Sequence, residues 1–240
     1  MFSISEVGKI LKATNRLNMP TEFNATLPIN IKVKKQLNPI RYLLQMGKKE
    51  LETKSYTKLD VGANYKAQIS QSDAKIEIKN LTKMPNIFNK FPDTLSFTVD
   101  ELLKEDPLKS SEKYKSFLLN HLANATTKDE FIFFSQMLLA LNQEIKHLFI
   151  KDNKKALIQF KHKKRKISFY SYFEHLGAIG GEIYLADEIC LNLMVEFQSS
   201  LVFIGRYIED LKGISVNIKQ DKVTPLFEIS ENENILNLKV

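Results

Sequence analysis

The stretch of sequence that decides the fold is residues 176–218, LGAIGGEIYLADEICLNLMVEFQSSLVFIGRYIEDLKGISVNI. Apolar and polar side chains alternate over residues 189–197, which is the period-two pattern of a half-buried strand. The same alternation over 179–185 predicts the preceding strand, and the aliphatic spacing over 201–211 predicts an amphipathic helix. Gly213 stands where a helix ends, and a further alternating strand follows it. The stretch therefore predicts a strand–strand–helix–strand unit with the helix on one face of the sheet.

A hairpin extends this unit toward the N-terminus. Residues 156–161 and 166–173 carry strand patterns, and the polar run 162–165 between them predicts a turn. Ser199 and Ser200 precede the predicted helix and are candidates to cap it. We therefore expect an α+β domain of mixed strands over residues 151–240.

Residues 84–150 change to a helical period. Thr127 and Glu130 form a capping-box pattern, and apolar residues at spacings of three and four then run from Phe131 to Leu148. This predicts one long buried helix, preceded by shorter helices that open near Thr98 and Ser111.

Residues 29–83 alternate with period two in five short runs separated by turn residues. Such a pattern predicts a small antiparallel β barrel, because closure is one of the few ways so short a sheet can hide its edges. Residues 1–28 predict a short amphipathic helix over 4–17, followed by a polar linker between Pro20 and Pro28. The predicted fold class is thus α+β in three parts: barrel, helical middle and C-terminal unit.

The composition is that of an ordinary globular chain. Its 240 residues are 43% hydrophobic and 26% charged, which excludes collagen, wholesale disorder and a disulfide miniprotein. Cys190 is the single cysteine, so an intrachain disulfide is excluded. No apolar run approaches the length of a membrane span, and MFSISEVGKI lacks the pattern of a secretory signal peptide. We therefore expect a soluble protein of a reducing compartment.

The formal charge of +7 is unevenly distributed. Residues 1–90 hold 16 Lys and Arg against 7 Asp and Glu. One interpretation is coding bias, since only four of the 35 basic residues are Arg, the residue favoured for phosphate and base contacts. The other is a nucleic-acid-binding barrel in which Tyr42, Tyr56 and Tyr65 stack on bases.

No motif of catalysis or of metal binding is present in the sequence. The four histidines show none of the spacings of a metal site, and Cys190 lacks an activating partner in its strand pattern. The glycines of 177–181 precede a strand pattern, so they predict a turn or bulge and not a phosphate-binding loop. We therefore expect a non-enzymatic protein with no catalytic residue, no cofactor and no metal.

The densest charge in the chain is the run KHKKRK at 161–166. Its members Lys163, Lys164, Arg165 and Lys166 lie at the predicted hairpin turn, so they are candidates for contacting an acidic protein surface or a phosphate backbone. The structural alternative is a solvated tip that resists edge-to-edge pairing. The sequence leaves both open.

The segment His175–Ile183 and the pattern after it resemble the C-terminal domain of flagellar hook-length control proteins. Leu176 and Gly177 match the Leu-Gly step of that family, and the alternating strands, helix and glycine-opened final strand follow in the family's order. The resemblance covers residues 155–220. It implies that Leu176 and Gly177 belong to a partner-binding unit, and that the partner is the cytoplasmic domain of the flagellar type III export switch protein.

The family's long extended ruler is missing from this chain. Only residues 18–28 have the composition of an extended linker, which spans on the order of 40 Å when stretched. The resemblance therefore implies a folded adaptor or substrate-specificity switch, not a measuring tape. The expected location is the cytoplasm, with export through the flagellar apparatus left open.

Overall fold

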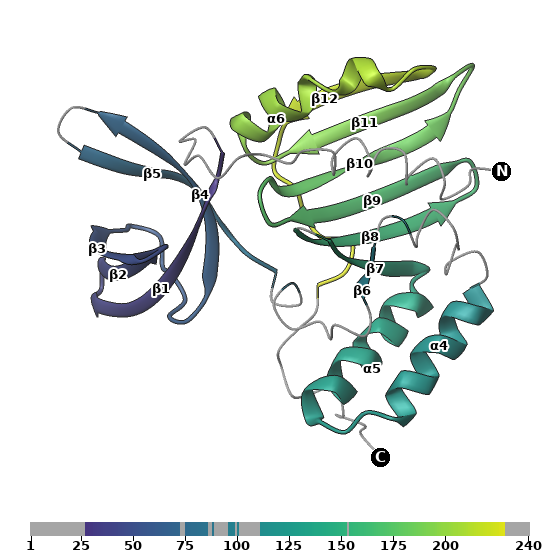
Figure 1. Cartoon of the computed structure of the whole chain (residues 1–240), viewed down its shortest axis with the longest axis horizontal. Helices are drawn as coiled ribbons and strands as arrows, with labels where there is room; N and C mark the ends of the chain where they lie inside the picture. Colours follow the sequence, from purple (N-terminus) through teal and green to yellow (C-terminus); the bar gives the residue numbers. More distant parts are fainter. Residues whose placement is uncertain are drawn as a thin grey trace.

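The computed structural model describes residues 27–72, 75–85, 88, 96–98, 100, 111–152 and 154–228. The helix expected over 4–17 and most of the one expected near Thr98 lie outside these residues. The described chain forms a five-stranded sheet, a pair of helices and a seven-stranded sheet that carries one further helix (Figure 1). The class is therefore α+β, as expected.

The N-terminal sheet is open and not a closed barrel, so the predicted closure is wrong. Its strand order is β3-β2-β1-β4-β5, and the two edge strands β3 and β5 do not pair. The central strand β1 pairs with β2 over one half of its length and with β4 over the other, which coils the sheet strongly (Figure 1). The strands are β1 (Ile29–Asn38), β2 (Arg41–Met46), β3 (Lys49–Lys54), β4 (Asn64–Ser72) and β5 (Lys75–Lys83).

The loop between β3 and β4 covers the core of this sheet where a barrel would join its edges. Leu59 is buried in that core, and its N–H donates to the Tyr42 hydroxyl at 3.4 Å. The neighbouring N–H of Asp60 donates to the Tyr65 hydroxyl at 2.9 Å. The backbone of Val33 bonds the same loop, donating to Ala63 and accepting from Gly62. Because the loop closes the core, β3 and β5 need not meet.

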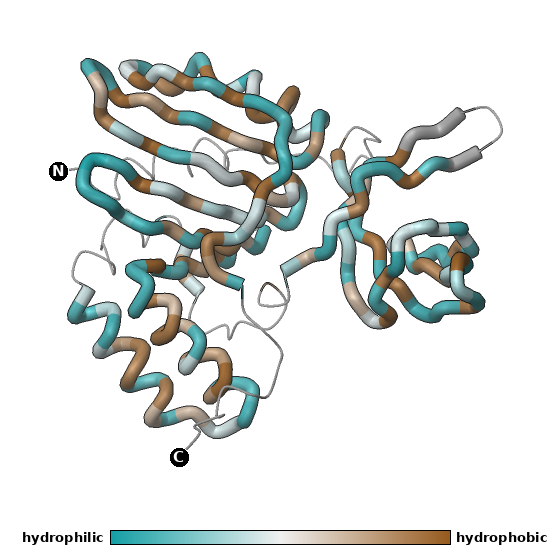
Figure 2. Tube along the Cα trace, turned by 180° about the vertical axis from the view of Figure 1, so that it is seen from behind, coloured by the Kyte–Doolittle hydropathy of each residue, from teal (hydrophilic) through white to brown (hydrophobic). Residues whose placement is uncertain are grey.

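The second sheet has the order β12-β11-β10-β9-β8-β7-β6. Its neighbouring strands are antiparallel except at the two ends, where β11 pairs with β12 and β6 with β7 in parallel. Polar and apolar residues alternate visibly along its outer strands (Figure 2). The strands are β6 (Ser96–Phe97), β7 (Ile145–Lys151), β8 (Lys155–Lys163), β9 (Lys166–Phe173), β10 (Gly177–Leu185), β11 (Ile189–Val195) and β12 (Ile214–Gln220).

Two helices, α4 (Ser111–Ala123) and α5 (Lys128–Asn142), pack at the β6–β7 end of this sheet (Figure 1). The capping box predicted at Thr127 and Glu130 is confirmed, with both of its hydrogen bonds formed. The long helix predicted to reach Leu148 is wrong in its length, since α5 ends at Asn142 and β7 follows. No described helix is both long enough and apolar enough to cross a membrane.

The helical pattern fails after Asn142 because the backbone turns there. Glu144 adopts a φ of +63°, in the left-handed region that ends a helix. The next residues are largely buried on both faces of a strand, so their apolar side chains fit either period. His147, which lies within the span of the predicted helix, is consequently part of the sheet.

The order predicted for the C-terminal unit is confirmed, with a shorter helix. Helix α6 (Gln198–Gly205) is followed by a single 3₁₀ turn over Ile208–Asp210 and then by β12. The predicted serine cap is wrong, because Phe197 occupies the N-cap position without a side-chain bond. The Ser200 hydroxyl donates instead to the Leu176 carbonyl at 2.7 Å, and Ser199 accepts from Gln68 of β4 at 3.0 Å.

The two faces of the large sheet are covered differently. Helix α6 packs on one face over the apolar residues of β10 and β11. The segment after β12, yellow in Figure 1, crosses the other face behind β10 and β9. Gly180 makes room for it, because a Cβ there would lie 2.8 Å from the Val223 side chain.

Candidate functional site

The predicted basic contact residues lie at an exposed two-residue turn. All four are exposed: Lys163, Lys164, Arg165 and Lys166. Strand β8 ends at Lys163 and β9 begins at Lys166. Lys164 has a φ of +53°, which a tight hairpin turn requires. The Lys166 ammonium pairs with Glu182 at 2.5 Å, whereas no ion pair with a described residue involves the other three. The tip therefore presents positive charge on a rigid hairpin.

An acidic turn borders this basic tip. In the pairing of β9 with β10, Lys166 lies opposite Tyr184. The Leu185 N–H donates to the Arg165 carbonyl at 3.4 Å. Asp187 and Glu188, both exposed, belong to the turn that follows Leu185. This end of the sheet thus carries both signs of charge, which favours a partner with a complementary pattern over a uniform polyanion.

Leu176 and Gly177 lie at the opposite end of β10 from the tip. The Leu176 side chain is completely buried in the cluster under α6. Gly177 has a φ of +80°, and a Cβ on it would lie 2.5 Å from the Phe197 ring. The structure therefore does not bring the six predicted residues together. Leu176 and Gly177 shape the unit from inside, while the tip is the accessible part.

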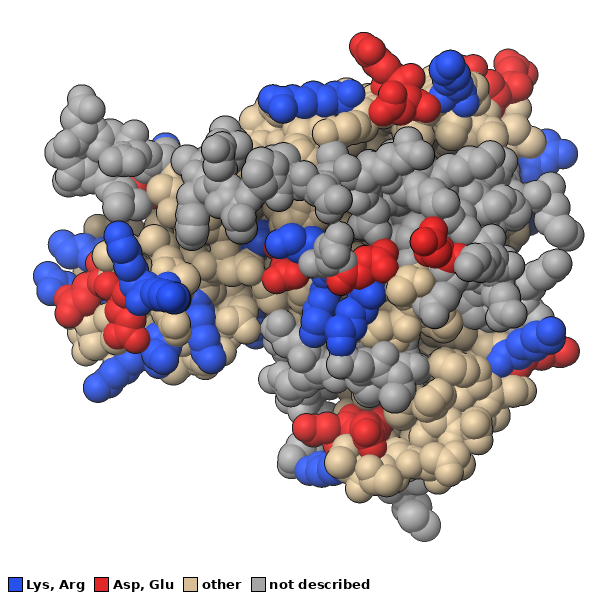
Figure 3. Space-filling view, viewed as in Figure 1, with Lys and Arg blue, Asp and Glu red and all other residues tan. Residues whose placement is uncertain are grey.

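The tyrosines expected to stack on bases are mostly unavailable. Tyr42 and Tyr65 are buried in the core of the five-stranded sheet, so this part of the nucleic-acid interpretation is wrong. Only Tyr56, 90% exposed, is free to stack on a base. Lys and Arg side chains do gather over this sheet, at the left of Figure 3. The basic surface remains, without the predicted aromatic platform.

The two sheets are joined by buried polar contacts. The Lys66 ammonium of β4 donates to the Asn30 side chain at 2.6 Å and to the Glu174 carbonyl between β9 and β10. Burial lowers the pKa of Lys66 to about 8. Together with the Gln68–Ser199 bond, this contact fixes β4 against the start of β10 and α6.

A cavity of about 270 Å³ lies beside this junction, a place that sequence reasoning did not identify. It is bounded by the end of β5, by the strands β8, β9 and β10, and by the C-terminal segment 223–228. Gln159 of β8 fastens that segment, accepting from the N–H groups of Leu226 and Phe227 and donating to the Phe227 carbonyl. The cavity is open on one side, and residues from three regions of the chain line it.

The orientation of Gln159 also fixes the state of a buried histidine. With its oxygen bonded to backbone N–H groups, the Gln159 amide nitrogen lies 2.9 Å from His147 Nε2 and donates to it. His147 is then neutral, with its proton on Nδ1, and that atom has no hydrogen-bond partner among the described residues. Burial lowers the pKa of His147 to about 3, in keeping with the neutral ring.

The polar groups in the cavity wall include the carboxyl of Glu196 and the phenols of Tyr170 and Tyr172. The Glu196 carboxylate accepts from the Thr82 hydroxyl and the Ala178 N–H, but its Oε2 has no partner among the described residues. Burial nevertheless raises the pKa of Glu196 to about 7. Burial and the nearby Glu196 charge raise the pKa values of Tyr170 and Tyr172, and the buried Tyr172 hydroxyl is also unpartnered within the described part of the chain.

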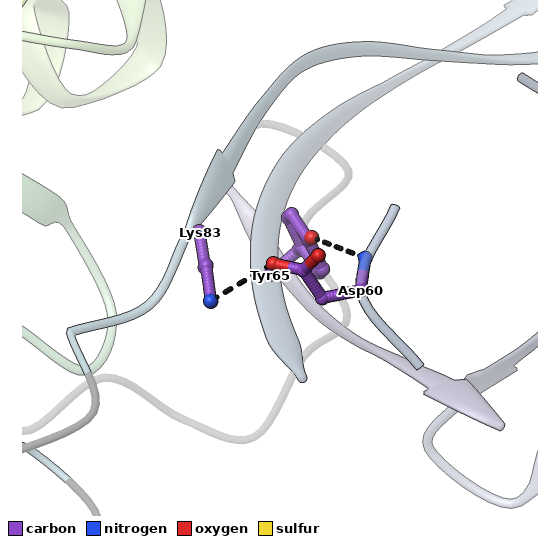
Figure 4. Close-up of polar contacts among 3 residues, drawn as sticks. All are labelled: Asp60, Tyr65 and Lys83. Carbon is purple, nitrogen blue, oxygen red and sulfur yellow. Dashed lines mark hydrogen bonds and ion pairs between the residues drawn. The ribbon is translucent and has the colours of Figure 1, made fainter. Parts of the chain in front are cut away.

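The lysine in the cavity wall is directed toward another carboxylate. Figure 4 shows the Lys83 ammonium facing Asp60, with Asp60 in turn bonded through its N–H to Tyr65. The Lys83–Asp60 distance is 2.9 Å. This pair, together with the Lys83 hydrogen bond, holds the pKa of Asp60 below its ordinary value. The pair thus links the end of β5 to the loop between β3 and β4.

A weak sequence signal for this cavity exists. Gln159, Tyr170 and Tyr172 share one face of neighbouring strands, at positions where a half-buried strand would carry plain aliphatics. Polar side chains at buried positions indicate a polar network or a ligand, but their convergence needs the strand register. The described residues contain no cluster of three or more His, Cys, Asp or Glu that could hold a metal ion.

Comparison with known proteins gave no match: no protein-family model matches the chain, and no similar curated protein or solved structure was found.

Proposed function

We propose that this chain is a non-enzymatic protein similar to flagellar hook-length control proteins, and that it binds the cytoplasmic domain of the flagellar export switch protein. The observation that carries the proposal is the order β10–β11–α6–β12 directly after Leu176 and Gly177. This order of two strands, a helix and a final strand is the one that the resemblance to the hook-length control family leads us to expect. The packing of α6 over β10 and β11 gives that order a shared hydrophobic core.

The basic tip is the binding surface in this proposal. Its lysines and arginine are exposed on a hairpin whose strands are paired within the seven-stranded sheet, so the backbone of the tip is ordered before binding. Charges of this kind act mainly on the rate of association with a complementary surface. The protein would therefore act as a folded adaptor or switch component.

The test is the binding of the full chain to the export switch domain. The first variant replaces Lys163, Lys164, Arg165 and Lys166 with Gln. The matched control replaces Lys34, Lys35, Lys48 and Lys49, which are equally exposed but belong to the five-stranded sheet, and it changes the net charge by the same amount. We expect the tip variant to bind at least about tenfold more weakly, and the control to bind like the wild type.

Failure of the wild-type chain to bind the export switch domain would contradict the proposal. Equal weakening by both variants would contradict the assignment of the tip, since it would mean that net charge alone matters. Truncation of the C-terminal domain is unsuitable, because β8, β9 and β10 share a core with α4 and α5.

Nucleic acid remains the alternative partner, favoured by the lysines of the five-stranded sheet (Figure 3). The same two variants separate the proposals. In the alternative, single-stranded RNA binding falls steeply with salt and is lost in the five-stranded-sheet variant but not in the tip variant. Absence of RNA binding at low salt excludes it.

A further inference from the structure

Three large apolar side chains are exposed at one end of the five-stranded sheet. Leu37 and Ile40 flank the turn between β1 and β2, and they are 40% and 41% exposed. Tyr56, two residues after the end of β3, is 90% exposed. Exposed apolar side chains are ordinary when they lie singly, whereas a group of them indicates a surface that contacts a partner.

The pairing of β2 with β3 brings these side chains to the same end. Arg41 of β2 lies opposite Lys54 of β3. One residue beyond, the Ser55 N–H donates to the Ile40 carbonyl at 2.9 Å, so the residue after Ser55 lies beside the β1–β2 turn. We call this region the small-sheet end, and it consists of residues 35–41 and 54–58.

The backbone of the β1–β2 turn is fixed locally. The Ile40 N–H donates to the side-chain oxygen of Asn38 at 3.1 Å, and the ring of Pro39 restricts its φ. The turn that carries Leu37 and Ile40 is therefore ordered before any contact, which lowers the cost of binding.

Positive charge surrounds the exposed apolar side chains. The basic residues within two positions of them are all exposed: Lys35, Arg41, Lys54 and Lys58. The nearest acidic residue on the loop side, Asp60, is paired with Lys83 at 2.9 Å (Figure 4). On the strand side, Glu52 lies further along β3, outside the small-sheet end. This end of the sheet thus combines an apolar centre with a positive rim.

The surface of a membrane that contains anionic lipids fits both features at once. Its negative potential attracts Lys and Arg, and its interfacial layer accepts aliphatic side chains and the amphipathic ring of tyrosine. Three of the four basic residues are lysines, which act as point charges and need no fixed ligand geometry. RNA fits this surface less well, because the aliphatic side chains of Leu37 and Ile40 cannot stack on bases.

We propose that the small-sheet end attaches the chain to the surface of membranes that contain anionic lipids. Leu37, Ile40 and Tyr56 enter the headgroup layer, and the four basic side chains contact lipid phosphates. The contact is peripheral and is made by turns, not by a membrane-spanning segment. It does not depend on the protein partner proposed above, because the basic tip belongs to the other sheet and the test uses lipid alone.

The experiment is co-sedimentation of the full chain with vesicles. One kind of vesicle is phosphatidylcholine alone, and the other contains about 30% phosphatidylglycerol, which makes its surface negative. We expect the chain to bind the anionic vesicles at least about tenfold more tightly.

A pair of variants separates apolar contact from charge. Replacing Leu37 and Ile40 with Asn leaves the net charge unchanged and should weaken binding to the anionic vesicles by at least about tenfold. The matched control replaces Leu185 and Val202, which are 45% and 48% exposed in the C-terminal unit, with Asn. It should bind within about twofold of the wild type.

Tyr56→Trp locates the contact, because the chain contains no tryptophan of its own. Its emission should move to shorter wavelength, and it should become shielded from acrylamide, when anionic vesicles are added. Val202→Trp, on α6, should show neither change.

Absence of binding to the anionic vesicles overturns the proposal, and so does equal binding to both kinds of vesicle. Full binding by the Leu37 and Ile40 variant, with thermal melting showing that it is folded, overturns it as well. Binding that leaves the emission of Tyr56→Trp unchanged would assign the contact to another basic surface and refute the proposal. A shift of that emission with single-stranded RNA but not with vesicles would give the surface to nucleic acid instead.

Discussion

Glu196→Gln should change the pH dependence of stability in a defined way. The pKa of Glu196 rises from an ordinary 4.5 to about 7 in the folded chain, chiefly through burial. At Glu196 the folded chain therefore binds more protons than the unfolded chain between these values, and the contribution of this residue to the free energy of unfolding falls as pH rises from 4.5 to about 7. Above that range the loss is complete. A difference of one in pKa corresponds to about 1.4 kcal/mol, so the whole loss is about 3 kcal/mol.

In the Glu196→Gln variant the side chain does not titrate, so this pH-dependent loss of stability is absent, while the hydrogen bonds of the carboxylate can be kept. Its side-chain oxygen can still accept from Thr82 and from the Ala178 N–H. The other charged and titratable groups near the site are unchanged: Lys83, Tyr170, Tyr172, Lys222 and Glu228. His147 and His175, whose pKa values burial lowers, occur in both proteins and cancel in the difference.

The assay is urea unfolding of both proteins from about pH 4 to about pH 8.5, with the free energies of unfolding subtracted at each pH. The variant should gain up to about 3 kcal/mol relative to the wild type as pH rises, then keep that gain. A difference that does not vary with pH would refute the reasoning, because it would mean that the folded Glu196 titrates like a solvated carboxyl.

Three further substitutions test the packing by thermal and urea unfolding. Leu193→Asp places a charge at a position where the side chain is only 8% exposed, so it should unfold the C-terminal unit. Leu185→Asp, at a 45% exposed position, should be tolerated. Equal losses of stability in the two variants would contradict the β11 register. Gly181→Ala should cost about 1–3 kcal/mol, because its Cβ would lie 2.1 Å from the Asn192 carbonyl oxygen. Gly205→Ala, with open space around it, is the matched control and should not destabilise. Thr127→Ala should cost about 1 kcal/mol by removing the capping box of α5, and no loss would mean that this cap is dispensable.

The parts of the fold that local patterns specify were predictable. The strand alternation of β10, β11 and β12 and the capping box at Thr127 need only neighbouring residues, and the structure confirms both. The closure of the small sheet was not predictable from such patterns. It depends on the loop that buries Leu59 and bonds Tyr42, an arrangement that joins residues far apart in the chain.

The end of α5 shows a second limit of the sequence patterns. Ile145 and Leu148 fit a helical period, yet they belong to β7. A strand buried on both faces is apolar at nearly every position, so its sequence can also fit the period of a helix. The cavity shows a third limit. Glu196, Tyr170 and Thr82 come from three different strands or their ends, and only the pairing of the strands and the path of residues 223–228 bring them together.

Whether the basic tip binds the export switch domain is tested by the association rate of the full chain with that domain, measured at low and at high salt. We expect the wild type to associate faster at low salt, and neutralisation of Lys163, Lys164, Arg165 and Lys166 to slow association and flatten its salt dependence. The variant should melt at the wild-type temperature, since exposed turn residues carry little stability. A folded tip variant with an unchanged association rate would contradict the claim.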